Sequence, residues 1–278
     1  MHLRLEGLTL RYGDRLALDD VSASLEGRII GLLGANASGK TSLLRILAGV
    51  QAAARGRAFI DGLEIHVGRR PGLSYLPQEI GGFPFWQRPA ETLSGTFILK
   101  GIAGHDERAK ELLAAVGLGN EDRSAAEFSG GMKQKLRITQ ALSHAPQVLI
   151  MDEPTTGLDT RERFRLLRII ERLRDRVSVL FSTHQPEDVA AVCDVVLILH
   201  RGRAAASGTP DAIAGMAKGR VYEVGVPAST LPAESEYEIA AVGRTDGTLR
   251  IRVVGEPPAG ATPVDPRLED AYLLLTQH

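Results

Sequence analysis

The sequence predicts an α/β fold with a substantially parallel sheet, on the strength of two observations. Apolar strand patterns recur in "RIIGLLG", "QVLIMDE", "VSVLFSTH" and "DVVLILHRG". Helical patterns lie beside them, from Lys40 to about Ala48 and at about 106–116, 130–144 and 160–175. Strands that alternate with helices of about ten or more residues indicate a parallel sheet with helices packed on its faces.

The first sixty residues predict a strand-and-turn region that precedes and flanks this pattern. Residues 3–10 alternate in the manner of a half-buried strand, and "RYGDR" follows as a turn. "RAFIDG" is a second strand that ends in a turn. We expect these strands to belong to the same domain as the parallel sheet.

After about residue 217 the character of the sequence changes. "RVYEVGV" and "EIAAVGRTDGTLRIRVVG" alternate with a period of two, and Asp246-Gly247 stands where a hairpin turn is expected. "PRLEDAYLLLTQ" predicts a short amphipathic helix at the end. We therefore expect a main domain over 1–217 and a small α+β accessory domain over 218–278, joined through "AGMAKG".

Composition excludes some functions and favours others. The chain of 278 residues is 44% hydrophobic and 24% charged, which is ordinary for a protein with a real core. A net charge of −1 argues against a general electrostatic grip on nucleic acid. The single cysteine, Cys193, lies in apolar "AVCDVVLIL", so we interpret it as a buried structural thiol. No signal-peptide core and no apolar run of about 18–20 residues is present, so we expect no membrane span in this chain.

The segment "GANASGKT" satisfies the pattern G-x-x-x-x-G-K-[ST] between a predicted strand and a predicted helix. Glycines let the backbone wrap a phosphate chain with its amide hydrogens pointing inward, and the helix N-terminus adds positive potential. Lys40 would bind the β- and γ-phosphates, Thr41 would give its hydroxyl to Mg²⁺, and Ser42 adds a donor one residue deeper. The whole loop is a predicted nucleotide site: Gly34, Ala35, Asn36, Ala37, Ser38, Gly39, Lys40, Thr41 and Ser42.

Two carboxylates follow a second apolar strand, in "VLIMDEP". Asp152 is expected to hold Mg²⁺, and Glu153 is placed to polarise a water that attacks the γ-phosphate. Acidic residues after a strand are common by themselves. Together with the phosphate loop they predict hydrolysis of a nucleoside triphosphate.

Five further motifs occur in a particular order around these two. They are Tyr12 in "LRYGD", Gln78 in "YLPQE", "FSGGM" at 128–132, "DEPTTGLD" at 152–159 and His184 in "STHQP". With the phosphate loop, they resemble the ATP-binding cassette family, the nucleotide-binding subunits of ABC transporters, over about residues 3–215. The resemblance implies a P-loop NTPase fold of the ABC ATPase type, with a helical subdomain at about 80–145 and ATP and Mg²⁺ as cofactors.

The resemblance also implies a role for each motif. Tyr12 would stack on adenine, Gln78 would be a second Mg²⁺ ligand and a hinge, and His184 would contact the γ-phosphate. Ser129, Gly130 and Gly131 precede a helical pattern and would form an anion-binding nest that closes on ATP held by a second subunit. Asp159 would contact the partner's phosphate loop, so two sites would lie in a head-to-tail homodimer. The alternative for Ser129 is an ordinary helix N-cap.

The apolar stretch "GGFPFW" after Gln78 has two open interpretations. Phe83, Phe85 and Trp86 would form a surface on which a membrane-spanning partner rests, because a cluster of exposed aromatics marks an interaction site. Alternatively, these rings pack under the following helix as part of the core.

The function predicted from these features is an ATPase that energises transport. "YLPQE", "FSGGMKQKLRITQAL" and the tail beyond "RVYEVGV" look most like the ABC-2 type exporter branch. The partner would be a separate membrane-spanning chain, and the subunit would lie in the cytoplasm on the inner face of the cell membrane. The alternatives are a soluble cassette ATPase that acts on ribosomes or DNA, and an importer subunit.

Overall fold

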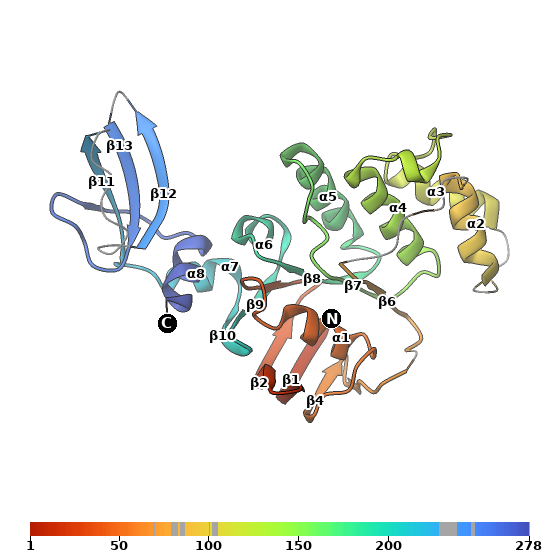
Figure 1. The fold of residues 1–278 in the computed structure, drawn as a ribbon, viewed down its shortest axis with the longest axis horizontal. Coiled ribbons are helices and arrows are strands. Elements are labelled where there is room, and N and C mark those ends of the chain that lie inside the picture. Colours follow the sequence, from red (N-terminus) through yellow and green to blue (C-terminus); the bar gives the residue numbers. More distant parts are fainter. Residues whose placement is uncertain are drawn as a thin grey trace.

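The computed structural model describes residues 1–68, 70–78, 83, 87–99, 101, 105–227, 238–245 and 248–277. Within these ranges the main-chain elements form three sheets and a set of covering helices (Figure 1). Among the described residues, every helix is too short or too polar to cross a bilayer.

A six-stranded sheet forms the centre of the main domain, in the order β10-β9-β3-β8-β7-β6. Five of its strands are parallel, and only β10 runs antiparallel, to β9. The bounds are β3 Ile29–Leu33, β6 Leu73–Leu76, β7 Val148–Met151, β8 Ser178–Thr183, β9 Val195–His200 and β10 Arg203–Gly208. Every residue of β3, β7 and β8 is buried, which is why β3 and β7 are apolar throughout and the centre of β8, Val179–Phe181, is apolar.

The N-terminal residues form an antiparallel sheet in the order β2-β1-β4-β5. Its strands are β1 His2–Tyr12, β2 Arg15–Glu26, β4 Arg55–Ile60 and β5 Leu63–Glu64. This sheet and the central sheet enclose α1 (Lys40–Leu47) in one apolar core, which includes Leu8, Leu18 and Leu44. The start of α1 is therefore fixed from both sides.

Two groups of helices flank the central sheet. The first is a bundle of α2 (Pro89–Leu99), α3 (His105–Ala115), the 3₁₀ turn η1 (Ala125–Glu127) and α4 (Gly130–Leu142), with Phe97 and Leu136 fully buried in its core. The second consists of α5 (Thr160–Leu173) and α6 (Pro186–Val192), which pack against the central sheet. The predicted α/β fold is confirmed, and the helices expected at 106–116, 130–144 and 160–175 are present.

The C-terminal residues form a third sheet in the order β12-β13-β11-β14. Its strands are β11 Val221–Pro227, β12 Glu238–Thr245, β13 Thr248–Val254 and β14 Thr262–Pro263. β12 and β13 are antiparallel with Thr245 opposite Thr248, while the expected turn residues Asp246 and Gly247 lie outside the described residues. Two helices, α7 (Pro210–Gly215) and α8 (Leu268–Thr276), lie between this sheet and the central six-stranded sheet (Figure 1).

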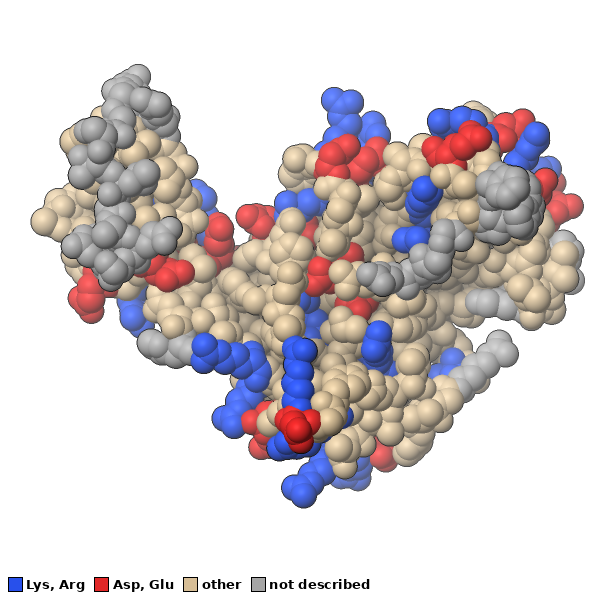
Figure 2. Space-filling model, in the orientation of Figure 1, with Lys and Arg blue, Asp and Glu red and all other residues tan. Residues whose placement is uncertain are grey.

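The surface carries charges of both signs. On the face drawn in Figure 2, Lys and Arg side chains stand among Asp and Glu side chains rather than forming one basic field. This distribution agrees with the net charge of −1.

Candidate functional site: a phosphate loop beside a buried acid

The phosphate loop connects the buried strand β3 to the first turn of α1. Gly34 lies against the neighbouring strand, since a Cβ there would stand 2.5 Å from the Leu199 carbonyl oxygen. Gly39 has a φ of +107° at the N-cap of α1, and a Cβ there would lie 2.6 Å from the Ala17 carbonyl oxygen. Both positions require glycine, and together they shape a cradle for the backbone amides that follow.

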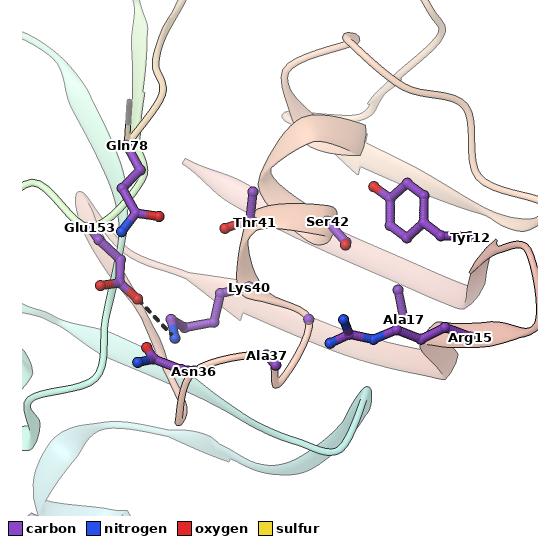
Figure 3. Close-up of a pocket in the computed structure, with 11 residues that line it drawn as sticks. Tyr12, Arg15, Ala17, Asn36, Ala37, Lys40, Thr41, Ser42, Gln78 and Glu153 are labelled. Atoms are coloured by element: carbon purple, nitrogen blue, oxygen red, sulfur yellow. Dashed lines mark ion pairs between the residues drawn. The ribbon is translucent and has the colours of Figure 1, made fainter. Parts of the chain in front are cut away.

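Lys40 is the first residue of α1 and its side chain is only 4% exposed. Its Nζ donates hydrogen bonds to the carbonyl oxygens of Gly34 (2.7 Å) and Ala35 (3.0 Å). The same Nζ lies 3.1 Å from Oε1 of Glu153. The lysine of the loop and the acid after β7 therefore form a buried ion pair (Figure 3).

A cavity of about 380 Å³ opens over this ion pair. Figure 3 places Lys40 and Glu153 at one end, and Tyr12 with Arg15 at the other. The residues that line it are Tyr12, Arg15, Ala17, Asn36, Ala37, Gly39, Lys40, Thr41, Ser42, Gln78 and Glu153. All of these except Arg15 and Ala17 were predicted from the sequence, Glu153 as a catalytic residue and the others as nucleotide-site residues.

Tyr12 ends β1, and its side chain extends along the wall of the cavity. The Tyr12 hydroxyl donates a hydrogen bond to Oε1 of Gln51 at 2.6 Å, and the residue is 43% exposed. This leaves the ring accessible to a flat ligand. Arg15 and Ala17 line the same end of the cavity, and the sequence analysis did not predict either as a site residue. The only sequence feature that links Arg15 to the site is its position three residues after Tyr12 in "RYGDR".

Glu153 is held in an unusual backbone conformation at the end of β7. Its φ is +45°, its amide donates to Oγ of Ser182 at 2.8 Å, and its Oε2 accepts from Oγ1 of Thr156 at 2.7 Å. Burial acts to raise the pKa of Glu153, but the hydrogen bond from Thr156 and the charge of Lys40 lower it more, so the pKa lies below its ordinary value. The carboxylate is thus ionised and fixed in direction.

His184 approaches Glu153 from the adjacent strand. It follows β8, its side chain is 39% exposed, and its Nδ1 lies 3.2 Å from Oε2 of Glu153. Glu153 and His184, both predicted to act at the γ-phosphate, therefore contact one another directly.

Asp152 contacts the same serine, Ser182, that binds the Glu153 amide. The residue is 2% exposed, and its Oδ1 accepts from Oγ of Ser182 at 2.7 Å. Its Oδ2 is buried and has no hydrogen-bond partner in the part of the chain that the structure describes. A buried carboxylate oxygen with an unused lone pair fits a metal ion or its water shell.

The donor set fits Mg²⁺. Thr41 and Gln78 line the cavity with oxygen-bearing side chains, and Asp152 offers the free carboxylate oxygen. In the described ranges no three His, Cys, Asp or Glu side chains cluster as a self-sufficient metal site. Mg²⁺ commonly binds through one or two protein oxygens together with waters and substrate phosphates, so the residues present suffice.

Ser129 and Asp159 cap two helices outside the cavity. Oγ of Ser129 accepts from the Met132 amide at 3.3 Å, and Oδ1 of Asp159 accepts from the Glu162 amide at 2.8 Å. The alternative considered for Ser129, an N-cap, is therefore present. Gly131 packs against Glu162, with Oε2 only 2.5 Å from where a Cβ would stand. In contrast, Gly130 is exposed.

A second cavity connects this region to the first. Its volume is about 310 Å³, and Gly130, Gln78 and Glu153 all line it. The helix that begins at Gly130 is thus a neighbour of the acid, although its cap lies outside the first cavity. The contact of Ser129, Gly131 and Asp159 with a second subunit stays a prediction.

Of the three aromatic residues after Gln78, the structure describes only Phe83. Phe83 is half-buried against the core of the helical bundle, and the guanidinium carbon of Arg137 lies 5.8 Å from its ring centroid. This packing favours the core interpretation for Phe83. Phe85 and Trp86 lie outside the described residues, so their docking role stays a prediction.

A buried carboxylate that the motifs did not reveal organises the segment around the acid. Asp188 of α6 is fully buried, and its Oδ2 accepts from Oγ1 of Thr155 (2.7 Å) and Oγ1 of Thr183 (3.1 Å). Its Oδ1 accepts from Nε of Arg163 at 2.5 Å. Thr155 and Thr183 stand close in sequence to Glu153 and His184, so Asp188 ties the two segments that carry them.

The fold and the site together define a P-loop NTPase with a buried carboxylate beside the lysine of its loop. Residues 18–156 match the family model described as ABC transporter. The chain is 34% identical over 214 residues to the energy-coupling factor transporter ATP-binding protein EcfA2 of Bacillus subtilis, covering 71% of this chain and 77% of that protein. It is 34% identical over 242 residues to a sulfate/thiosulfate import ATP-binding protein CysA 2 of Chromobacterium violaceum, covering 84% of this chain and 66% of that protein.

A solved structure shows the same fold. A dimeric post-hydrolysis state of an ATP-binding cassette, bound to ADP and Pi, superimposes with a TM-score of 0.65. The alignment covers 74% of this chain and 98% of that chain, at 20% sequence identity. The chain belongs to the ATP-binding cassette family of ABC transporters. It is an ATP-binding subunit of such a transporter and an ATPase.

Proposed function

We propose that this subunit hydrolyses Mg-ATP at the cavity over Lys40 and Glu153, and that it drives transport through a separate membrane-spanning chain. The observation that carries the proposal is the buried Lys40–Glu153 pair, with Nζ and Oε1 3.1 Å apart at the base of the phosphate loop. A phosphate-binding cation and a directed carboxylate in one cavity are what in-line attack of water on a γ-phosphate requires.

The residues of this chain divide the work of hydrolysis. Tyr12 stacks on the base, the loop amides and Lys40 bind the phosphates, and Glu153 accepts a proton from the attacking water. His184, held by Oε2 of Glu153, orients that carboxylate and contacts the γ-phosphate. When bound through Thr41, Gln78 and Asp152, Mg²⁺ supplies charge neutralisation on the phosphates.

We further propose a head-to-tail homodimer, in which Ser129, Gly130, Gly131 and Asp159 of one subunit complete the ATP site of the other. The dimeric state of the related cassette bound to ADP and Pi supports this arrangement. In this proposal the subunit lies on the cytoplasmic face of the membrane, where ATP is available.

The direction of transport has two candidates. We propose export, because the C-terminal region beyond residue 217 resembles the tail of the ABC-2 exporter branch. Import is the second candidate, since the relatives above include one named for sulfate/thiosulfate import and one named for an energy-coupling factor transporter.

Purification of the tagged chain from detergent-solubilised membranes tests both parts of this proposal. We expect one membrane-spanning chain to copurify, identified by mass spectrometry. A complex that also holds a component dedicated to capturing solute outside the cell would overturn export in favour of import. Quantitative recovery on ribosomes or DNA, with no membrane chain, would overturn transport altogether.

A further inference from the structure

Tyr12 stands at the tip of a β-hairpin, with much of its side chain open. β1 and β2 pair as far as Tyr12 and Arg15, and the turn between them consists of Gly13 and Asp14. Tyr12 is 43% exposed, although its ring lies at one end of the cavity over the phosphate loop (Figure 3). A side chain with this much open surface has several rotamers available, so its place in the cavity depends on a specific contact.

Gln51 supplies that contact from outside the cavity. The Tyr12 hydroxyl donates to Oε1 of Gln51 at 2.6 Å, which is a short and well-formed hydrogen bond for a hydroxyl donor. Gln51 does not line the cavity, so it acts on a ligand only through the Tyr12 ring. The two residues are 39 positions apart in the sequence, and the fold brings them together.

The backbone of Gln51 is fixed at the end of α1. The amides of Val50 and Gln51 both donate to the Arg45 carbonyl oxygen, at 2.9 and 3.2 Å. Gly49 has a φ of +68°, and a Cβ there would stand 2.8 Å from the Gly68 carbonyl oxygen, so the chain leaves the helix through a turn that requires glycine. The carboxamide of Gln51 therefore projects from a defined place.

α1 connects this place to the phosphate loop. The helix begins at Lys40, and its residues Leu44 and Leu47 are fully buried between the two sheets. Because the core holds α1, the positions of Lys40 and Gln51 are fixed relative to one another. The hydrogen bond from Tyr12 to Gln51 thus sets how far the tyrosine ring stands from the lysine of the loop.

We propose that Gln51 is a positioning residue for nucleotide binding, because it holds the Tyr12 ring where a base can stack while the phosphates occupy the loop at Lys40. This inference rests on the proposed role of Tyr12 as the platform for the base. Without the hydrogen bond, the ligand itself would have to order the ring, and that cost would lower its affinity. Gln51 lies in none of the motifs of the sequence, so the sequence analysis did not predict it.

The test removes each partner of the hydrogen bond in the full chain. Gln51→Leu removes the acceptor, and Tyr12→Phe removes the donor but keeps the ring, so either variant tests the bond if the other does not fold. We expect each to raise the Kd for Mg-ADP and the KM for ATP about threefold to tenfold, which corresponds to one hydrogen bond. The kcat of Gln51→Leu should stay within about twofold, because contact with the base is common to the ground and transition states.

A matched control removes a tyrosine hydroxyl elsewhere. The Tyr222 hydroxyl donates to the Gly219 carbonyl oxygen at 2.7 Å in the C-terminal region. Tyr222→Phe should leave the Kd for Mg-ADP and the KM for ATP at their wild-type values.

A double variant and a conservative variant separate positioning from a structural role. Gln51→Leu combined with Tyr12→Phe should bind Mg-ADP no more weakly than either single variant, since both changes remove the same bond. Gln51→Glu keeps an accepting oxygen and should bind within about twofold of wild type. Effects that multiply in the double variant would overturn the proposal, and so would a Gln51→Glu variant that binds as weakly as Gln51→Leu. A wild-type Kd in Gln51→Leu, with or without a lowered melting temperature, would also overturn it.

Tyr12→Ala distinguishes failure of the inference from failure of the proposed function, because it removes the ring itself. If Tyr12→Ala binds Mg-ADP as tightly as wild type, Tyr12 is not the platform for the base, and the role of Gln51 falls with that part of the proposed function. If Tyr12→Ala binds weakly while Gln51→Leu and Tyr12→Phe behave as wild type, the platform stands and only the positioning role is wrong.

Discussion

Replacing Asp188 by asparagine should destabilise the protein strongly, although Asp188 touches neither the phosphate loop nor the cavity above it. The carboxylate is fully buried and accepts three hydrogen bonds, from Thr155, Thr183 and Arg163, at 2.7, 3.1 and 2.5 Å. Asparagine keeps the size of the side chain and one accepting oxygen. It replaces the other oxygen with an NH₂ group, which faces hydrogen-bond donors of Thr155 and Thr183 or of Arg163. It also removes the negative charge opposite Arg163.

The expected loss of folding stability depends on which acidic partner Arg163 keeps in the variant. Its other acid is Glu187, which lies 3.5 Å away and is 61% exposed, so it screens the stranded guanidinium only weakly. Breaking a buried ion pair by removing one partner costs about 3–5 kcal/mol. Because asparagine preserves one acceptor, we expect about 3 kcal/mol. The control is Glu171→Gln, which removes a surface carboxylate 3.0 Å from Arg174, and it should cost less than about 1 kcal/mol.

Urea unfolding of the two variants, followed by circular dichroism, measures the difference. A double-mutant cycle with Arg163→Met isolates the pair, because Arg163→Met should cost less in the Asp188→Asn background than in wild type. If Asp188→Asn costs as little as Glu171→Gln, or if the cycle is additive, the carboxylate does not hold these segments together and the reasoning fails.

Three further predictions concern the site. Glu153→Gln should lower phosphate release by about 10²–10⁴-fold while equilibrium binding of Mg-ATP persists, and near-wild-type turnover would remove Glu153 from the chemistry. The pKa of Glu153 is lowered in the folded state, so its carboxylate stabilises the native state at pH values above the unfolded pKa, and this stabilisation is lost as the pH falls. The free energy of unfolding should therefore differ less between wild type and Glu153→Gln in acid than at pH 7. A difference that stays constant with pH would contradict the lowered pKa of Glu153. Ser129→Arg should lower the free energy of unfolding by about 1 kcal/mol, because it removes the N-cap of α4. The isolated subunit should bind nucleotide as tightly as wild type, but size-exclusion chromatography should show no ATP-dependent dimer. Loss of nucleotide binding by the isolated subunit would place Ser129 in the site of its own chain.

The fold class could be predicted because its long elements carry strong local signals. The continuous apolar run of β9 and the amphipathic period of α5 are properties of sequence alone. Two short elements, β6 and α6, were not predicted. β6 has four residues and exists because it pairs with β7, and α6 has seven residues and packs on the sheet through Val189 and Val192. For elements this short, tertiary contacts decide the conformation and local preference does not.

The candidate site was predictable where a motif lies at the end of a strand. Lys40, Glu153 and His184 follow β3, β7 and β8, which are neighbours in the sheet, so the parallel topology brings them to one edge. Asp188 was not predictable, because an acidic residue in the first turn of a helix is common on exposed surfaces. Its burial depends on Thr155 and Thr183, which reach it only in the folded chain.

The Lys40–Glu153 ion pair also forms only in the folded chain. It affects when the proposed hydrolysis can begin. In the structure the Lys40 ammonium already contacts Oε1 of Glu153 and two loop carbonyls, so its capacity for hydrogen bonds is filled. If Lys40 binds the β- and γ-phosphates as proposed, it must leave at least one of these partners. If the partner released is Glu153, the carboxylate loses a charge that lowers its pKa, and it becomes a stronger base when a phosphate is present to be attacked. His184 and Thr156, both on Oε2, keep the carboxylate aimed during this exchange. In the proposed mechanism, exchange of Glu153 for a phosphate oxygen at Lys40 would thus couple the basicity of Glu153 to occupancy of the phosphate loop.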